Sequence, residues 1–104
     1  MDRKIVNMEK IKEITFYRKE DEKNVSWEKA SIEVDGNLRL DGYDLGETPL
    51  KFWGDDDYEY WLTVDKEWKD TILLLLAKER FEDFGSFRKW LDEKDIPNRF
   101  ANWV

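Results

Sequence analysis

The residues best placed to do chemistry are acidic side chains concentrated between positions 41 and 60. This stretch carries seven acidic residues and one basic residue, so it accounts for −6 of the chain's net charge of −7. The sequence contains no histidine and no cysteine. This excludes the usual general base near neutral pH, thiol nucleophiles and thiolate metal sites. Any chemistry would therefore rest on carboxylates, lysines or tyrosines.

Two kinds of chemistry fit these acids on composition alone. The aspartates at 55–57, with Glu59, Asp41 and Asp44, could supply oxygen ligands to Ca²⁺ or Mg²⁺, but the EF-hand's glycine and final glutamate are missing from the spacing. A carboxylate pair including Glu59 could serve glycoside hydrolysis, yet the sequence indicates no cleft. An exposed turn after Gly54 explains the same aspartates. We predict no catalytic residue, no cofactor and no dedicated metal site.

A binding surface explains these residues better. Alternation along YEYWLTV places Glu59, Trp61 and Thr63 on one strand face, and Tyr17 is expected beside them on a neighbouring strand. Exposed aromatics among charges are typical of protein interfaces, and an acidic segment would steer a basic partner. The predicted partner-binding residues are Asp41, Asp44, Asp55, Asp56, Asp57, Glu59 and Trp61. Alternatively, Trp61 packs beneath the acidic loop or the N-terminal residues.

The function predicted is therefore a non-catalytic protein-interaction domain, of adaptor, inhibitor or immunity type, that binds a basic protein surface. The alternative is a small-ligand or divalent-cation module that uses the same acidic loop. No basic footprint for nucleic acid is visible, and no apolar run approaches the roughly twenty residues that span a bilayer. We expect a cytoplasmic monomer without nucleic-acid or membrane partners.

The elements that must position these residues begin with strands. Residues 11–18, 27–34, 37–40 and 58–64 alternate apolar, β-branched or aromatic residues with polar ones. At Asp35-Gly36, a three-residue loop with Gly36 left-handed pairs Ile32 with Leu38. A two-residue loop would instead pair Ile32 with Arg39 and mix the faces.

Glycines and a proline dominate the segment between the third and fourth predicted strands. Asp41-Gly42 and Leu45-Gly46 predict a loop, and Thr48-Pro49 predicts a short helix over 49–53, capped by Thr48 and closed by Gly54. This helix should present Leu50 and Trp53 inward.

Two longer helices are expected in the last third of the chain. The first covers residues 66–80 with Asp65 as N-cap, and the second covers 87–94 with Ser86 as N-cap. The apolar run at 72–76 needs cover on more than one side. We expect the second helix to supply it, with a second copy of the chain as the alternative. Phe100 and Trp103 should hold the C-terminus against the body.

Strands first and helices last predict a single α+β domain over residues 1–104: an antiparallel sheet of about four strands with C-terminal helices packed on one face. Most of the sixteen aromatic residues should then lie in the core.

Parts of the chain also resemble a family of small uncharacterised bacterial proteins. The resemblance lies in Asp35-Gly36, the spaced Leu38 and Leu40, the segment Gly-Tyr-Asp-Leu-Gly at 42–46, and Tyr-Glu-Tyr-Trp at 58–61. The tail with Ile96-Pro97, Phe100 and Trp103 is similar to the family's closing segment. The resemblance covers roughly half of the chain. It implies a compact bacterial domain and no particular activity.

Overall fold

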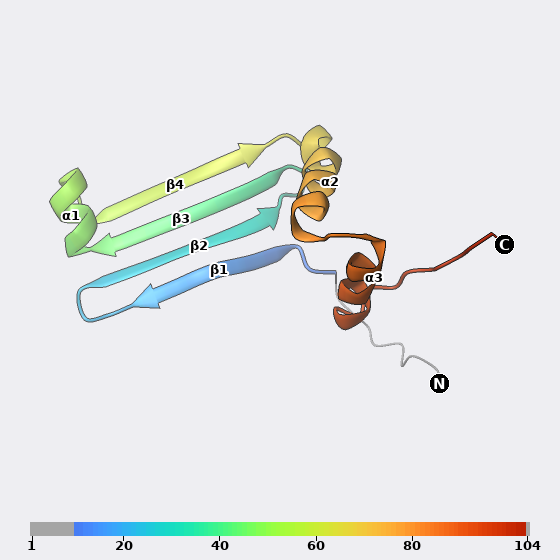
Figure 1. Cartoon of the computed structure of the whole chain (residues 1–104). Helices are drawn as coiled ribbons and strands as arrows, with labels where there is room; N and C mark the ends of the chain where they lie inside the picture. The colour runs from blue at the N-terminus through green and yellow to red at the C-terminus, as the bar shows by residue number, and fades with distance from the viewer. Residues whose placement is uncertain (1–9, 104) are drawn as a thin grey trace. The chain divides into compact units, whose positions relative to one another are not determined.

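The computed structural model describes residues 10–103, and it is an α+β structure with four strands followed by helices (Figure 1). The predicted fold class, a four-stranded antiparallel sheet at the N-terminal side followed by helices, is confirmed. The elements are β1 (Glu13–Glu20), β2 (Asn24–Ile32), β3 (Leu38–Gly46), α1 (Glu47–Trp53), β4 (Asp57–Val64), the short 3₁₀ helix η1 (Lys66–Trp68), α2 (Lys69–Arg80) and α3 (Phe84–Glu93).

The four strands lie in chain order, β1-β2-β3-β4, and every neighbouring pair is antiparallel. The register of the β2–β3 hairpin is the predicted one. Ile32 pairs with Leu38 and Ala30 with Leu40, and Gly36 has a left-handed φ of 95°. The Glu33 N–H donates to the Asn37 carbonyl at 2.8 Å, which closes the three-residue loop. A register that keeps apolar side chains on one face decided the loop length.

The loop predicted after Leu40 is wrong, because β3 continues through both glycines to Gly46. Gly42 is buried and pairs with Tyr60 on β4. A β-carbon at Gly42 would overlap the Tyr60 ring, so this glycine allows an aromatic side chain to lie across the strand. Glycine inside a strand often marks such a close approach.

Tyr17 is not on the Trp61 side of the sheet as predicted. The register of β1 against β2 shifts between Thr15, which pairs with Lys29, and Tyr17, which pairs with Glu28. The irregularity adds one residue and turns every later β1 side chain to the opposite face. Tyr17 therefore lies on the same face as Tyr60, near enough to contribute to the raised pKa of Tyr60.

Helix α1 begins earlier than predicted, at Glu47, with Gly46 as its N-cap. Thr48 is not the cap: its N–H donates to the Asn24 side chain at 3.0 Å. Gly54 ends the helix in the left-handed conformation, as predicted. The expectation that Leu50 and Trp53 point inward is wrong, because both side chains are exposed and Pro49 is the buried residue of this helix.

Contacts divide the chain into two compact units, which we call the strand unit (up to Glu67) and the helical unit (from Trp68). In the strand unit, Lys66 donates its N–H to the Asn37 side chain at 2.9 Å. The predicted cap Asp65 is not the residue before α2, because η1 intervenes and Trp68 occupies the N-cap position. A 3₁₀ turn is common at the start of an α-helix.

In the helical unit, Asp83 rather than Ser86 is the N-cap of α3. The Ser86 N–H donates to the Asp83 carboxylate at 2.8 Å. In return, the Asp83 N–H donates to the Ser86 hydroxyl at 3.3 Å. The two residues form a capping box, so Ser86 is the third helical residue and the helix begins earlier than predicted. The hydrogen bond that the Ser86 N–H donates to the carboxylate is the main cause that lowers the pKa of Asp83.

This cap carries a testable pH dependence. Because the folded-state pKa of Asp83 is depressed, its ionised form stabilises α3 above the unfolded pKa of about 3.9, and this contribution is lost as the pH falls through the lower folded value. Asp83→Ala should reduce the melting temperature of the helical signal in far-UV circular dichroism by a few degrees at pH 7. Asp83→Asn keeps the hydrogen-bond acceptor, so its melting temperature at pH 7 should be near that of the wild type. Because asparagine does not titrate, its melting temperature should fall less than that of the wild type as the pH is lowered. An alanine variant as stable as the wild type would contradict the cap.

Burial differs most from expectation. Within residues 10–103 no aromatic side chain is buried, so the prediction that most aromatics are core is wrong there. Fully or largely exposed aromatics include Phe52, Trp61 and Trp103. Each unit is much shorter than the whole chain, and short units bury a smaller fraction of their surface.

The predicted cover of the apolar run is also not observed. The four leucines at 73–76 are each more than half exposed. The aromatic residues of α3 instead gather at the end of α2, where Phe81 lies 4.9 Å from Phe87 and 5.6 Å from Trp90 between ring centroids. Phe100 packs against Phe84 at 5.7 Å, as expected of the tail. Trp103 is fully exposed, so the expectation that it holds the C-terminus against the body is wrong.

Candidate functional site

The alternation of strand side chains sorts the sheet into two faces. We call the one that carries Trp61 the Trp61 face, and the opposite one the Tyr60 face. From the observed register, the Trp61 face includes Trp27, Lys29, Arg39, Asp41, Tyr43, Asp57, Glu59, Trp61 and Thr63. The Tyr60 face includes Tyr17, Glu28, Ala30, Leu40, Gly42, Asp44, Tyr58, Tyr60 and Leu62.

Trp61 is the main aromatic side chain of the candidate site, and it is 61% exposed. The alternative in which it packs beneath the acidic loop does not describe the observed side chain. Arg39 lies over the Trp61 ring, with its guanidinium carbon 5.4 Å from the ring centroid. Such a cation–π contact restrains an otherwise exposed indole. Trp61 is thus a partly ordered apolar surface within reach of solvent.

Asp41 lies directly across from Trp61 in the register, but its charge is compensated. The Arg39 Nε donates to the Asp41 carboxylate at 2.9 Å, and the Asp41 side chain is only 22% exposed. Arg39 therefore joins Trp61 and Asp41 into one contact group. Of the predicted binding residues, Asp41 serves to position Arg39 more than to attract a partner.

Four of the predicted acidic residues lie at the N-terminal end of β4. Asp57 and Glu59 are on the Trp61 face, while Asp55 and Asp56 occupy the turn between α1 and β4. No ion pair within residues 10–103 involves any of these four acids. Asp55 accepts the Asp57 N–H at 3.2 Å, which orders the turn. These four carboxylates form what we call the acidic end of β4.

Tyr43 extends the site onto β3. Its ring stacks on Trp27 with centroids 5.8 Å apart, and the Asp57 carboxylate lies near its hydroxyl. Desolvation, followed by the charge of Asp57, raises the pKa of Tyr43, so its hydroxyl remains a donor at neutral pH. Two aromatic contacts of the site, Tyr43 and Trp27, were not predicted from the sequence.

Arg39 and Tyr43 could both have been found from β3. Arg39 was already part of the predicted strand 37–40, and its pairing with Thr63 on β4 places it next to Trp61. The observed strand Leu38–Gly46 also carries Tyr43 on the same face as Asp41. The prediction of a loop at the glycines removed Tyr43 from the sheet. The missing signal was an aromatic residue, Tyr60, opposite a strand glycine.

Asp44 belongs to the other face and is separate from the acidic end of β4. It pairs with Tyr58, which stacks on Trp53 at 4.8 Å and on Tyr60 at 5.3 Å between centroids. The Tyr60 hydroxyl donates to Glu28 at 2.6 Å. Desolvation and this bond raise the pKa of Tyr60. The Tyr60 face thus holds an ordered aromatic stack beside Asp44.

The structure gives no geometric support to a cation site. Among residues 10–103, no group of three or more acidic side chains is arranged to hold a metal ion. The helices described in the same range are also too short or too polar to cross a membrane.

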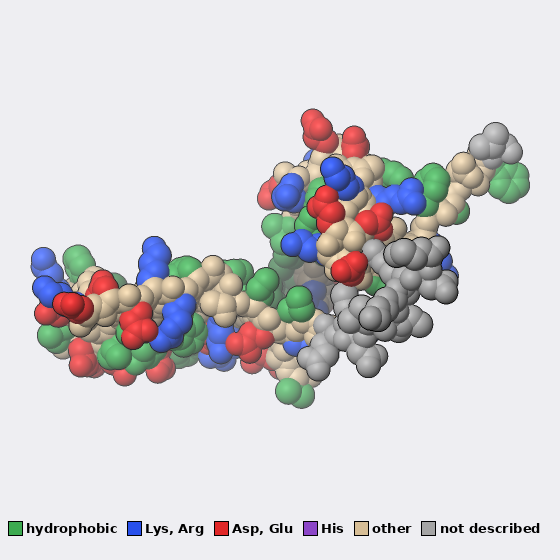
Figure 2. All heavy atoms as spheres, turned by 90° about the horizontal axis from the view of Figure 1, so that it is seen from below, with side chains coloured by type: hydrophobic (Ala, Val, Ile, Leu, Met, Phe, Trp, Pro, Cys, Tyr) green, Lys and Arg blue, Asp and Glu red, His purple; other side chains and the backbone are tan. Residues whose placement is uncertain are grey.

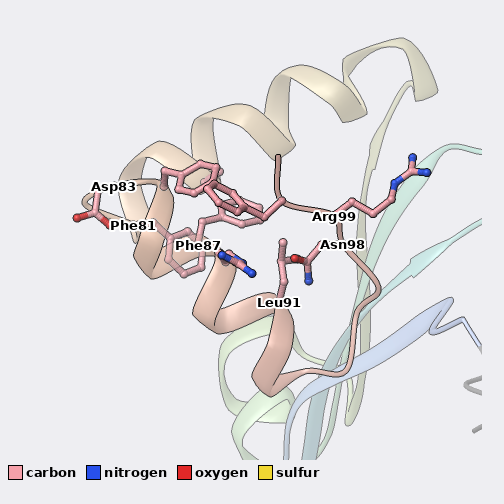
Figure 3. Close-up of a pocket in the computed structure, with 10 residues that line it drawn as sticks. Phe81, Asp83, Phe87, Leu91, Asn98 and Arg99 are labelled. Carbon is pink, nitrogen blue, oxygen red and sulfur yellow. The ribbon is translucent and has the colours of Figure 1, made fainter. Parts of the chain in front are cut away.

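A pocket of about 360 Å³ lies in the helical unit, around the aromatic residues that follow α2 (Figure 3). Its walls include Phe81, Phe87 and Leu91. In Figure 3 the carboxylate of Asp83 and the guanidinium of Arg99 extend away from the hollow rather than into it. Polar groups that converge on the ligand are what give a pocket its specificity. The other two polar residues of the lining make contacts within the protein: Arg88 lies over the Phe100 ring at 4.7 Å, and Asn98 donates to Asp92 at 2.9 Å. The pocket therefore indicates no particular ligand chemistry.

Comparison with known proteins adds no relative: no family model, no curated protein and no solved structure matches this chain. The resemblance to small bacterial proteins stays a prediction. Function must therefore be inferred from the geometry of the sheet.

Proposed function

We propose that this chain is a non-catalytic protein-interaction domain, of adaptor, inhibitor or immunity type, which binds a basic protein partner as a monomer. The binding surface comprises the acidic end of β4 and the exposed ring of Trp61. A single observation carries the proposal: four carboxylates without an ion pair in the described structure lie on or beside the same strand as a 61% exposed tryptophan.

The two parts of this surface would do different work. An exposed aromatic ring contributes apolar area at low cost in side-chain entropy, and tryptophan is among the residues that dominate binding energy at interfaces. Arg39 already restrains the Trp61 ring, so less freedom is lost on binding. The uncompensated carboxylates raise the rate at which a basic surface is encountered.

The arrangement of charge also limits which partners fit. Lys29 and Arg39 are on the Trp61 face, and Arg39 is held by Asp41. The face is therefore not uniformly acidic, and a partner needs its basic residues at the Asp57 end. The sequence alone suggested one acidic loop as the binding site. The geometry favours a smaller surface, in which the acidic end of β4 lies next to the exposed ring of Trp61.

A pull-down from a lysate of the source organism tests this function. We expect the wild type to retain a protein with a basic surface at low salt and to release it at about 1 M salt, where the Debye length is about 3 Å. A matched bait, with Asn in place of Asp55, Asp56 and Asp57, should retain much less of the same protein. Retention that is equal for both baits, or unaffected by salt, would contradict the proposal.

A further inference from the structure

The two outer strands of the sheet, β1 and β4, differ in how they protect their free edges. An outer strand has unpaired backbone groups that can pair with another chain, and natural proteins block such edges with bulges and charged side chains. β1 has both devices: an irregularity at Thr15–Tyr17 and the run Arg18-Lys19-Glu20 at its end. Figure 2, which views the molecule from the β1 side, shows acidic and basic side chains interspersed along the strands.

The edge of β4 has no bulge and no basic residue, and its charged side chains are the two acids Asp57 and Glu59. Its pairing with β3 is regular from Asp57 to Val64, and its sequence DYEYWLTV contains no lysine, arginine or proline. Among residues 10–103, β3 is the only strand that pairs with β4. An eight-residue stretch of regular strand is long enough for a second strand to add to it.

The hydrogen-bond pattern shows which backbone groups of β4 are free. In an antiparallel pair, residues alternate between those that bond to the partner strand and those that point away from it. The Gly46 N–H donates to the Asp56 carbonyl at 2.8 Å, so the even-numbered residues of β4 bond to β3. The backbone groups of the odd-numbered residues Asp57, Glu59, Trp61 and Thr63 therefore point toward the free edge. The Asp57 N–H already donates to the Asp55 side chain at 3.2 Å, so the groups open to another strand are the Asp57 carbonyl and the N–H and C=O groups of the other three residues.

These four residues are also those of β4 whose side chains lie on the Trp61 face. The free donors and acceptors, the acidic charge and the exposed tryptophan thus belong to the same residues. An added antiparallel strand would place its own bonded residues directly beside them, with side chains on the same face.

We propose that β4 is extended by an antiparallel strand from the partner: a basic, extended segment with lysine or arginine at alternate positions and apolar residues between. This inference rests on the proposed function, and it specifies how the basic partner is held. The basic side chains lie beside Asp57, Glu59 and Trp61. The apolar side chains continue the row formed by Tyr58, Tyr60 and Leu62 on the Tyr60 face. Main-chain bonds supply affinity and the alternating side chains supply specificity.

Peptide binding to the full chain tests this mode directly. The probe is a synthetic octapeptide of alternating lysine and valine with blocked ends, measured by isothermal titration. In the proposed register the lysine N–H groups bond to β4 and the valine N–H groups face solvent. N-methylation of the lysine amides should weaken binding about tenfold or more, whereas methylation of the valine amides should change it by less than about threefold. Both peptides keep the same charge.

Two further variants locate the peptide. Glu59→Lys on β4 should weaken binding by about tenfold, and Glu20→Lys on β1 should leave it nearly unchanged. Equal binding of the two methylated peptides would overturn strand addition, while binding that still depends on Glu59 would preserve the proposed function. Dependence on Glu20 instead of Glu59, or no binding of the unmethylated peptide at millimolar concentration, would also overturn strand addition at β4.

Discussion

Replacement of Gly46 by alanine should lower the free energy of unfolding of the strand unit by about 3 kcal/mol or more. Gly46 has φ 128° and ψ −151°, a backbone region that residues with a side chain essentially do not adopt. An added β-carbon would also run into the backbone carbonyl of Lys23. A backbone atom cannot rotate away, so the strand end itself would have to move.

The consequence should extend beyond one residue, because Gly46 joins three elements. It ends β3, pairs with Asn24 of β2, and is the N-cap of α1. Its N–H also donates to the carbonyl of Asp56, in the turn just before β4. Moving this backbone would disturb the turn that carries the acidic end of β4.

Chemical denaturation followed by tryptophan fluorescence gives the measurement, and Gly54→Ala gives the control. Gly54 also has a positive φ, of 75°, but no atom lies within 4 Å of its added β-carbon. This control should cost only about 1–2 kcal/mol. Equal losses for the two variants would show that the positive φ alone matters and that the contact with Lys23 does not.

The double variant Asp57→Lys with Trp61→Ala should reduce affinity for the basic partner by about a hundredfold or more. The first change reverses a charge next to the partner's basic side chains, and the second removes the apolar anchor. Far-UV circular dichroism should be unchanged, because Trp61 is 61% exposed and the Asp57 side chain lies on the exposed end of the strand. The affinity of the purified partner, measured by isothermal titration, gives the result.

The sequence predicted the parts of the fold that depend on local pattern. The β2–β3 register followed from the need to place Ile32, Leu38 and their neighbours on one face, and Gly36 supplied the left-handed residue. The Gly54 helix end followed from the same kind of rule. In each case residues close in the chain determine the outcome.

Two errors in the sheet came from features that the neighbouring residues in the chain do not indicate. Gly42 reads as a strand breaker until Tyr60, which lies across it, is known. The irregularity in β1 that moves Tyr17 to the other face has no mark in the sequence such as a glycine or proline. Neither effect can be derived from alternation alone.

The candidate site was predicted in composition but not in arrangement. Seven residues were expected to act together, yet Asp44 lies on the Tyr60 face and Asp41 is engaged by Arg39. Charge counted over residues 41–60 cannot show which carboxylates are compensated, because Arg39 lies just before this stretch and binds Asp41 two residues further along the same strand. The site that remains is smaller and is centred on β4.

The central claim is that one face of β4 binds the basic partner, and a matched pair of variants tests it most directly. The control variant, Asp44→Lys with Trp53→Ala, makes the same charge reversal and also removes one tryptophan, but on the side of the Tyr60 face. There Tyr58 pairs with Asp44 and stacks on Trp53. The claim predicts that this pair keeps affinity for the partner within about threefold of wild type, while Asp57→Lys with Trp61→Ala loses about a hundredfold. Equal losses in the two double variants, or the larger loss at Asp44 and Trp53, would contradict it.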